Sequence, residues 1–387
     1  MDVYDDQFYG YTRRLLASLG LWPSQSSRYR KVIWIFALSL YVHGIVFQYT
    51  TFITRQYNIQ LFIELMSLNP LLFLYIIKHN AVYLNFANVK LLLEQINYDC
   101  IAITDSRELE IIQKYASKGK FYTIYSALFM YITTSMFIFS LCIPDILNFV
   151  APLEEPRLRE LPTPVDCFLD QQQFFYFIVS DFALIALIGM TTFIATETMF
   201  MMFILHACGL FAIASYRISH AFDDCTNKSI IHAKIVHAVK IHERSLQFMD
   251  FINSSFALSY LLLAIAGVIS MTINMVRLFQ AIELHISNDI FVSAMYVFTH
   301  FLYVFWVNYF GQILLDHSET VYEATYSARW YMAPLHSQKL LLFILQRSSK
   351  ACNFSVFSGV VIASMDGFAS IVSLAMSYFT VLHSMRS

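Results

Sequence analysis

Seven stretches of mostly apolar residues, each long enough to cross a bilayer, constrain the fold of this chain more than any other feature. A membrane-spanning helix needs about 20 such residues to cross a hydrocarbon core of about 30 Å. We therefore predict an all-α membrane protein with seven transmembrane helices, at residues 32–53, 61–77, 121–143, 174–203, 254–275, 291–315 and 357–382.

The composition fits a chain whose main solvent is the bilayer. Of the 387 residues, 58% are hydrophobic and only 13% are charged, whereas an average soluble domain has about 25% charged residues. The net charge of −2 provides no basic stripe for a nucleic acid, and no phosphate-loop, hydrolase or metalloprotease motif occurs. His232, His237 and His242 recur at steps of five, so successive rings would lie about 140° apart around a helix. We expect no enzyme activity, no metal site and no cofactor.

The distribution of Lys and Arg predicts the orientation, because basic loops are retained on the cytoplasmic side. If the amino terminus lies in the cytosol, 20 of the 25 basic residues fall in cytoplasmic segments and five in external ones. We therefore expect a cytoplasmic amino terminus and an extracellular carboxyl terminus. This orientation is the reverse of that of a G-protein-coupled receptor.

Four parts are expected along the chain: a cytoplasmic segment at 1–31, a six-helix transmembrane bundle at 32–315, a cytoplasmic anchor region at 316–356, and a last transmembrane helix with a short tail at 357–387. Helical sequence at 85–120, 217–253 and 316–350 predicts extensions that pack together in the cytosol. Residues 174–218 contain no helix breaker and predict one long helix.

The external loop 144–173, rich in proline and acidic residues, predicts a semi-rigid lid. Cys142 and Cys167 lie on the same side as this lid. A disulfide between them and two unpaired thiols are both open, because spacing does not fix geometry.

The last span carries its polar residues on one face. Steps of three and four separate Asp366, Ser370, Ser373, Ser377, Thr380 and Ser384. Such a face is typical either of close helix packing or of a water-filled path closed by a hydrophobic constriction such as Val381. The pattern leaves both open, and a pore would need an oligomer. Among the other charged residues, Glu197 is expected at the inner membrane boundary, where solvent lowers the cost of a charge.

Aromatic, methionine and hydroxyl side chains gather in the predicted outer halves of the spans. The mix suits a small, mostly apolar ligand held by packing and a few polar contacts, although helix packing alone accounts for any single one of them. The candidate ligand-binding residues are Phe73, Tyr131, Thr134, Met136, Phe175, Phe182, Ile185, Met295, Tyr296 and Thr299.

Short runs in the carboxyl-terminal third carry a more specific pattern: YFGQ at 309–312, SE at 318–319, ATY at 324–326, WY at 330–331, LLLFILQRSSK at 340–350 and SYFTVL at 377–382. Their order and spacing resemble the insect odorant receptor family. His206 in its long helix, and His242 followed by Leu246, Gln247 and Phe248, are also similar to the middle section of that family. The related gustatory receptors end in a different motif, which residues 377–382 do not reproduce.

The resemblance implies a ligand-gated, non-selective cation channel, built as a tetramer around a pore that the last helix lines. Val381 falls at the hydrophobic gate of the family, and Ser377, Thr380, Ser384 and Met385 belong to the same pore segment. Ser384 and Met385 stand where the co-receptor has glutamine and leucine.

The family's cytoplasmic helix ends form an anchoring interface, for which the candidates are Tyr326, Trp330, Leu341, Leu345 and Arg347. The segment 217–253 is too short to hold the co-receptor's long insertion, which implies an odour-tuned subunit. Its implied partners are odorant co-receptor subunits, a small volatile organic ligand, membrane lipid and conducted cations, in the plasma membrane of olfactory sensory neurons. The alternatives are a gustatory-type receptor channel, a seven-span transporter and a metabotropic receptor.

Overall fold

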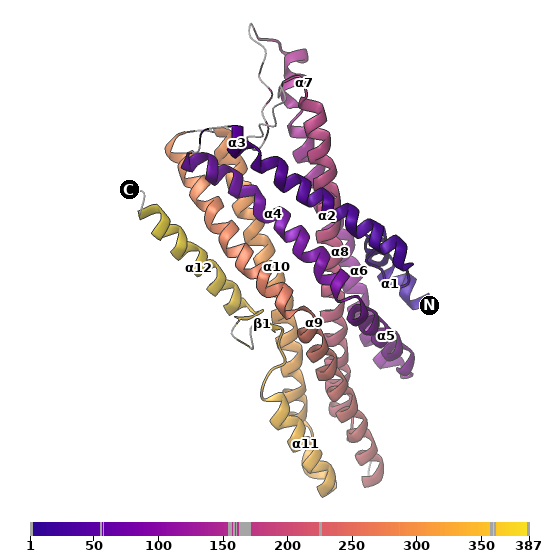
Figure 1. Cartoon of the computed structure of the whole chain (residues 1–387). Helices are drawn as coiled ribbons and strands as arrows, with labels where there is room; N and C mark the ends of the chain where they lie inside the picture. Colours follow the sequence, from indigo (N-terminus) through magenta and orange to yellow (C-terminus); the bar gives the residue numbers. More distant parts are fainter. Residues whose placement is uncertain are drawn as a thin grey trace.

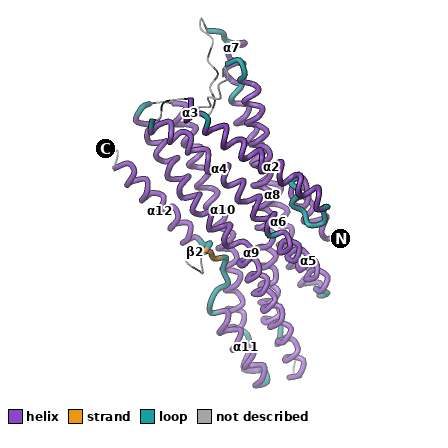
Figure 2. The backbone as a smooth tube through the Cα atoms, in the orientation of Figure 1, coloured by secondary structure: helices purple, strands orange, loops and turns teal. Residues whose placement is uncertain are grey.

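In a computed structural model, the described residues form a bundle of long helices and one short pair of strands (Figures 1 and 2). The structure describes residues 3–54, 56, 58–153, 157, 159, 161, 172–223, 227–285, 287–356, 359 and 361–384. Its helices are α1 (Val3–Ser18), α2 (Ser27–Tyr49), α3 (Thr51–Thr54), α4 (Ile59–Leu84), α5 (Phe86–Ala102), α6 (Ser106–Ser140), α7 (Ile143–Val150), α8 (Phe175–Ser219), α9 (Lys228–Glu283), α10 (Ser287–Ser327), the 3-10 turn η1 (Trp330–Met332), α11 (Leu335–Ser348) and α12 (Met365–Ser384). Strand β1 (Ser355–Val356) pairs antiparallel with β2 (Val361–Ile362).

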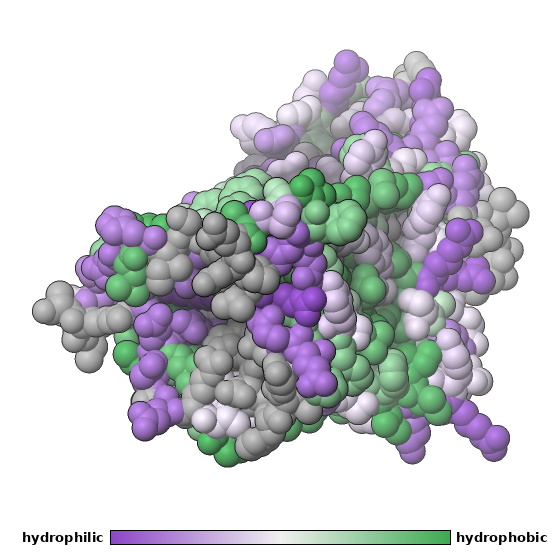
Figure 3. All heavy atoms as spheres, turned by 90° about the horizontal axis from the view of Figure 1, so that it is seen from above, coloured by the Kyte–Doolittle hydropathy of each residue, from purple (hydrophilic) through white to green (hydrophobic). Residues whose placement is uncertain are grey.

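Seven helical segments in the described part of the chain are long and apolar enough to cross a membrane, which confirms the predicted number of spans. They are Ser27–Thr54, Ile59–Leu84, Ser106–Ser140, Phe175–Ser219, Lys228–Glu283, Asp289–Ser327 and Met365–Ser384. Large apolar side chains such as Phe129, Ile132 and Leu258 are exposed on the bundle. In Figure 3, which looks onto the end that carries α7, hydrophobic residues likewise reach the surface between polar ones. An exposed apolar surface of this kind suits contact with lipid.

Helices α8, α9 and α10 run from one end of the bundle to the other. We name the end that carries α7 the upper end and the end that carries α11 the lower end, as they stand in Figure 1. The 45 residues of α8 form one helix, roughly 68 Å long at 1.5 Å per residue, as the lack of a breaker predicted. The expected boundary after residue 315 lies inside α10, which continues through it without a break.

At two ends, the predicted span extends three or more residues beyond the helix that the structure shows. The third span ends with α6 at Ser140, and Pro144 lies in the first turn of α7, where a missing backbone N–H costs nothing. The last span begins at Met365 rather than at residue 357, because β2 occupies part of that apolar segment as a strand and pairs with β1, which directly precedes residue 357. The apolar run is therefore shorter as a helix than its composition indicated.

The main core lies in the lower half of the bundle, around the middle of α8. Every residue from Thr198 to Phe211 is buried there, since α6, α9 and α10 all pack against α8. A polar contact ties α5 to this core: Asp99 accepts Arg244 Nε at 2.9 Å, and its other oxygen lies 3.1 Å from His206 Nε2. The main buried cluster therefore lies in the lower half, and this contact connects α5 to it.

Candidate functional site

Six of the ten predicted ligand-binding residues are wholly or partly enclosed by the upper half of the bundle. Thr134, Phe175 and Ile185 are buried, and Tyr131, Phe182 and Tyr296 are half-buried. The Tyr131 hydroxyl lies 2.8 Å from Thr191 Oγ1 and so joins α6 to α8. Ile185 belongs to a buried cluster with Leu72, Tyr41 and Tyr75, which joins α8 to α2 and α4.

The other four predicted residues, Phe73, Met136, Met295 and Thr299, are exposed on the outside of the bundle. Their assignment to a ligand site stays a prediction. Helix α10 has almost no hydrophobic asymmetry, because its apolar residues cover all faces of the helix. The sequence therefore could not indicate which residues of this helix face inward.

Two residues of α4 that the sequence patterns did not single out, Tyr75 and His79, are buried beside Tyr41 of α2. The Tyr75 ring packs 5.8 Å from the Tyr41 ring, measured between centroids, and a β-carbon at Gly189 of α8 would stand 2.2 Å from it. Within the described residues, the Tyr75 hydroxyl and both ring nitrogens of His79 have no hydrogen-bond partner. A Tyr and a His four residues apart in an apolar span are the signal that could have located them.

Further unpartnered polar atoms lie near the upper ends of α4, α9 and α10. In the described chain, Asn69 Oδ1, Asn274 Oδ1, Ser293 Oγ and Arg277 Nε are buried without a partner. The rest of the Arg277 guanidinium is engaged: Nη1 donates to Ser67 Oγ at 2.7 Å and Nη2 to Asp289 Oδ1 at 3.2 Å. Buried polar atoms are nearly always satisfied, by protein, by water or by a ligand. The upper half therefore combines apolar surface with polar atoms that are able to bind a small organic molecule.

Below these residues, a buried ion pair joins four helices. Lys78 of α4 donates to Glu197 of α8, and only 3% of the Lys78 side chain and 12% of the Glu197 side chain are exposed. The hydroxyls of Tyr303 on α10 and Tyr260 on α9 donate to the same carboxylate, at 3.1 and 3.4 Å. The solvent expected around the Glu197 charge is largely excluded by protein, while its place at the membrane boundary stays a prediction. Its charge is tolerated because Lys78 and two tyrosines replace the water.

Helix α12 has two different faces. Val372, Ala375, Phe379 and His383 pack towards α9. The residues of the predicted polar face, Asp366, Ser370, Ser373, Ser377, Thr380 and Ser384, are all exposed, as is Val381. The hydroxyls of Ser377, Thr380 and Ser384 donate to carbonyls of their own helix. Packing of this polar face against another helix of the same chain, one of the two explanations left open, is therefore not what the described residues do.

The start of α12 is fixed to α10 by residues of the YFGQ motif and its neighbour. Gln312 Oε1 accepts the Met365 N–H at 3.1 Å, and Asn308 Oδ1 accepts the Ser364 N–H at 3.1 Å. Ser364 Oγ in turn accepts the Gly367 N–H at 3.0 Å and so caps the helix. The motif thereby sets the position from which the last helix rises.

The upper lid is partly described. Asp145 on α7 accepts the Tyr176 hydroxyl at 2.5 Å and Arg159 Nε at 3.0 Å, and these bonds hold the pKa of Asp145 below its usual value. These contacts tie the described part of the lid to α8. Cys142 directly precedes α7, whereas Cys167 and the predicted pore residue Met385 lie outside the described residues.

The predicted anchor residues fall into two groups. Leu341 is buried in the core and Leu345 is half-buried, whereas Tyr326, Trp330 and Arg347 are exposed. Further exposed apolar side chains surround them at the lower end, namely Tyr331, Leu335, Leu342 and Phe343. We call Tyr326, Trp330, Tyr331, Leu335, Leu342 and Phe343 the lower apolar surface. The repeated leucines of 340–345 alone did not indicate which of them is exposed.

A comparison with protein-family models shows to which family the chain belongs. Residues 58–376 match the model described as 7tm Odorant receptor. The chain belongs to the odorant receptor family. A receptor of this family is not an enzyme, so that expectation is confirmed. With seven candidate spans, this odorant receptor is a multi-pass membrane protein.

Solved structures and curated relatives agree with this membership. The insect olfactory receptor OR5 of Machilis hrabei in complex with eugenol has the same fold, with a TM-score of 0.76 and 13% identity over 99% of this chain and 100% of that one. OR5 without eugenol gives a TM-score of 0.74 and 14% identity over 98% and 99% of the two chains. The odorant receptor coreceptors of Ooceraea biroi and Drosophila melanogaster are 25% and 26% identical to 40% of this chain. The matches span only about a third of the length of those co-receptors, 32% and 31%.

Proposed function

We propose that this odorant receptor is the odour-binding subunit of a ligand-gated, non-selective cation channel in the plasma membrane of olfactory sensory neurons. The observation that carries the proposal is the exposed polar face of α12, which includes Ser377, Thr380, Ser384 and Val381. Hydroxyl groups along such a face replace part of the hydration of a passing cation, and an apolar ring formed by Val381 closes the path by dewetting. Met385 belongs to the same proposed segment.

One such helix cannot enclose a path, so the proposal requires a tetramer with odorant co-receptor subunits. The lower apolar surface supports an interface at that end, because exposed apolar patches mark contact sites on parts of a protein that face water. In this proposal the amino terminus and the lower end are cytoplasmic and the carboxyl terminus is extracellular. The distribution of Lys and Arg supports that orientation.

In this proposal the ligand is a small volatile organic molecule bound in the upper half of the bundle. Tyr75, His79 and Tyr296 supply polar contacts, and Ile185, Phe182 and the aromatic residues around them supply apolar contacts. The ion pair of Lys78 and Glu197 lies within one helical turn of Tyr75 along α4, where α4, α8, α9 and α10 meet. A shift of α4 or α10 upon ligand binding would therefore be transmitted to all four helices through these contacts.

Whole-cell voltage clamp tests the function directly. Cells expressing this chain with or without an insect odorant co-receptor are presented with volatile esters, alcohols, aromatics and hydrocarbons while G-protein signalling is blocked in the pipette. We expect a rapid inward cation current in co-expressing cells. Saturable uptake without conductance would instead support a transporter, and a response that disappears with the G-protein block would support a metabotropic receptor. Current from this chain alone would contradict the requirement for the co-receptor.

A further inference from the structure

The beginning of α2 carries basic side chains that no acidic residue nearby in sequence balances. Between Asp6 and Glu64 the sequence contains six Arg and Lys residues and no acidic one, and five of the six precede residue 32. Arg28 and Lys31, in the first two turns of α2, are both exposed and form no ion pair with the described residues. The helix begins at Ser27, so the positive end of its dipole adds to these two charges.

Arg30 lies between these two residues in sequence but points to a different part of the molecule. Its guanidinium stands 3.1 Å from the centroid of the Phe86 ring and 6.0 Å from that of the Tyr83 ring, where α4 meets α5. Around a helix, Arg28 lies about 200° from Arg30, whereas Lys31 lies only about 60° from Arg28. Figure 1 shows α1 beside the first turns of α2. Arg28 and Lys31 therefore share an outer face of α2, away from the contacts of Arg30.

An exposed and mostly apolar face continues from these two charges along α2. Steps of three and four residues from Arg28 follow one face of a helix, and every residue that they reach is exposed: Val32, Ile35, Ser39, Val42, Val46 and Tyr49. One leaflet of a bilayer core is about 15 Å deep, which corresponds to about ten residues of helix. An acyl chain that packs along Val32, Ile35 and Val42 therefore has its headgroup beside Arg28 and Lys31.

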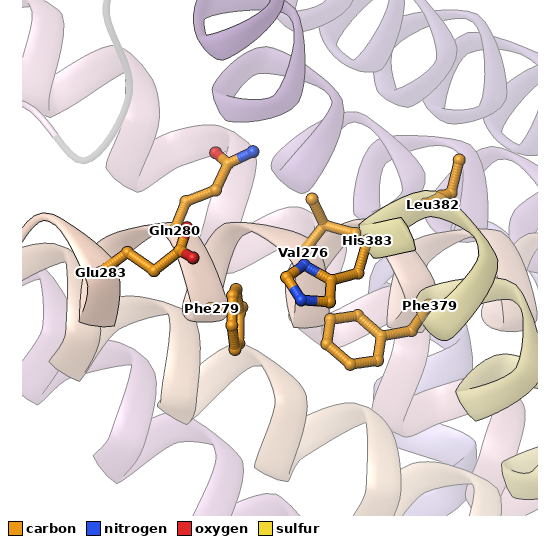
Figure 4. A pocket seen from close by; sticks show the side chains of 7 residues that line it. All are labelled: Val276, Phe279, Gln280, Glu283, Phe379, Leu382 and His383. Atoms are coloured by element: carbon orange, nitrogen blue, oxygen red, sulfur yellow. The ribbon is translucent and has the colours of Figure 1, made fainter. Parts of the chain in front are cut away.

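The upper end of the bundle has a different charge pattern. Arg277 is buried there and donates to Asp289, and Arg159 donates to Asp145. The groove between α9 and α12 at that end, which Figure 4 shows, is lined by an acidic residue, Glu283, and by no Arg or Lys among the described residues. The uncompensated positive charge is thus a feature of the beginning of α2.

We propose that the corner formed by Arg28 and Lys31, together with the apolar face that follows them, binds an anionic phospholipid such as phosphatidylserine. The two basic residues are neighbours on the helix, and they meet the phosphate and the carboxylate of this headgroup. Phosphatidylcholine lacks the carboxylate and carries a quaternary ammonium, which the two cations repel. The choice of leaflet rests on the proposed orientation: with a cytoplasmic amino terminus, the corner lies in the cytoplasmic leaflet, where anionic lipids are enriched.

Binding is tested on the full-length chain in nanodiscs that contain a photoactivatable analogue of either phosphatidylserine or phosphatidylcholine. Mass spectrometry of the peptides locates the labelled residues. We expect the phosphatidylserine analogue to label residues 28–42 roughly tenfold more than the phosphatidylcholine analogue does, because two basic residues act at the membrane surface. The double variant Arg28→Gln with Lys31→Gln should lose this preference. Lys228→Gln with Lys240→Gln removes the same charge from exposed positions of α9 and should keep it.

Equal labelling of the unmodified chain by both analogues would overturn the proposed site. A preference that persists in the variant of Arg28 and Lys31, or that disappears equally in the α9 control, would overturn it as well. The preference of the unmodified chain should also fall as salt is raised, since salt screens exposed charges, and a preference unaffected by salt would contradict the proposal without any variant.

The outcome is separable from the other proposals. A nanodisc presents the same lipids in both leaflets and labelling needs no current, so neither the orientation nor the channel function affects the result. Staining of an amino-terminal epitope in intact and permeabilised cells tests the orientation separately. An epitope stained in intact cells would overturn the assignment to the cytoplasmic leaflet, while the labelling result would still decide whether the corner binds the lipid.

Discussion

Gly311 of α10 lies so close to the segment before α12 that a β-carbon at position 311 would stand 2.1 Å from the Ala363 carbonyl oxygen. The neighbour is backbone, so no side-chain rotation relieves the contact. This close approach gives a physical reason for the glycine in the YFGQ motif. Together with Asn308 and Gln312, it holds the start of α12 against α10.

We expect Gly311→Ala to displace the start of α12 and to reduce the odour-evoked current strongly, with an overpacking cost of about 1–3 kcal/mol or more. Gly267→Ala on α9 is the control, because a β-carbon there has nothing within 4 Å. Current amplitude normalised to surface expression is the measurement. Equal currents from both alanine variants would contradict this role of Gly311.

The buried pair of Lys78 and Glu197 predicts an asymmetric response to substitution. Lys78→Met leaves the Glu197 carboxylate buried without its counter-charge, and we expect a loss of about 3–5 kcal/mol in the free energy of unfolding. In the double variant Lys78→Met with Glu197→Gln, no charge remains and most of that stability should return. Thermal unfolding of the purified chain in detergent compares the three proteins. A double variant no more stable than Lys78→Met would count against the ion pair.

Val381 and Val372 lie on opposite faces of α12 and offer a matched test of the gate. If Val381 closes the path, Val381→Ala removes apolar contact worth about 1 kcal/mol and raises the unliganded current roughly fivefold. Val372→Ala makes the same chemical change on the face towards α9, and it should leave the unliganded current near its normal level. A bulky residue at Ser377 or Ser384 should instead lower the single-channel conductance. An unaltered baseline and conductance in all these variants would remove α12 from the pore.

The lower apolar surface predicts that assembly depends on α11. Phe343 is 65% exposed in the single chain, so Phe343→Glu should cost little folding stability but should prevent apolar contact with a second subunit. Co-purification with the co-receptor, followed by mass photometry, measures the fraction of tetramer, which we expect to fall more than tenfold. Gln346→Glu adds the same charge at another exposed position of α11 and should assemble normally. A normal tetramer from Phe343→Glu would place the interface elsewhere.

Hydrophobic length and helical period were enough to predict the seven spans, the unbroken course of α8 and the single polar face of α12. Both signals failed where a helix and a strand have equally apolar sequences. The segment before Met365 is as apolar as a helix, and only its pairing as β1 and β2 distinguishes it. No local signal joins Lys78 to Glu197, because 119 residues separate them and each resembles a boundary charge when taken alone.

For a different reason, the sequence did not separate the enclosed odour-site candidates from the exposed ones. Tyr131 and Ile185 are enclosed by the bundle, whereas Met136 and Met295 are exposed, because apolar residues surround helices that contact both lipid and protein. The polar atoms of Tyr75 and His79, which are buried without a partner among the described residues, distinguish the interior of the bundle more clearly. A buried polar group in a membrane span has a cost, which packing alone does not explain.

Because the paired strands β1 and β2 precede α12, this helix is able to tilt as a unit, unlike the other long helices. Bending α9 or α10 in the middle would break backbone hydrogen bonds that connect successive turns, whereas tilting α12 about its non-helical connection strains only the hydrogen bonds at its start, to Asn308 and Gln312. The barrier to such a tilt then resides in the side-chain contacts of α12 with α9 and α10. Substitutions where α12 contacts α10 should therefore alter the rates of opening and closing while the melting temperature of the chain stays nearly constant.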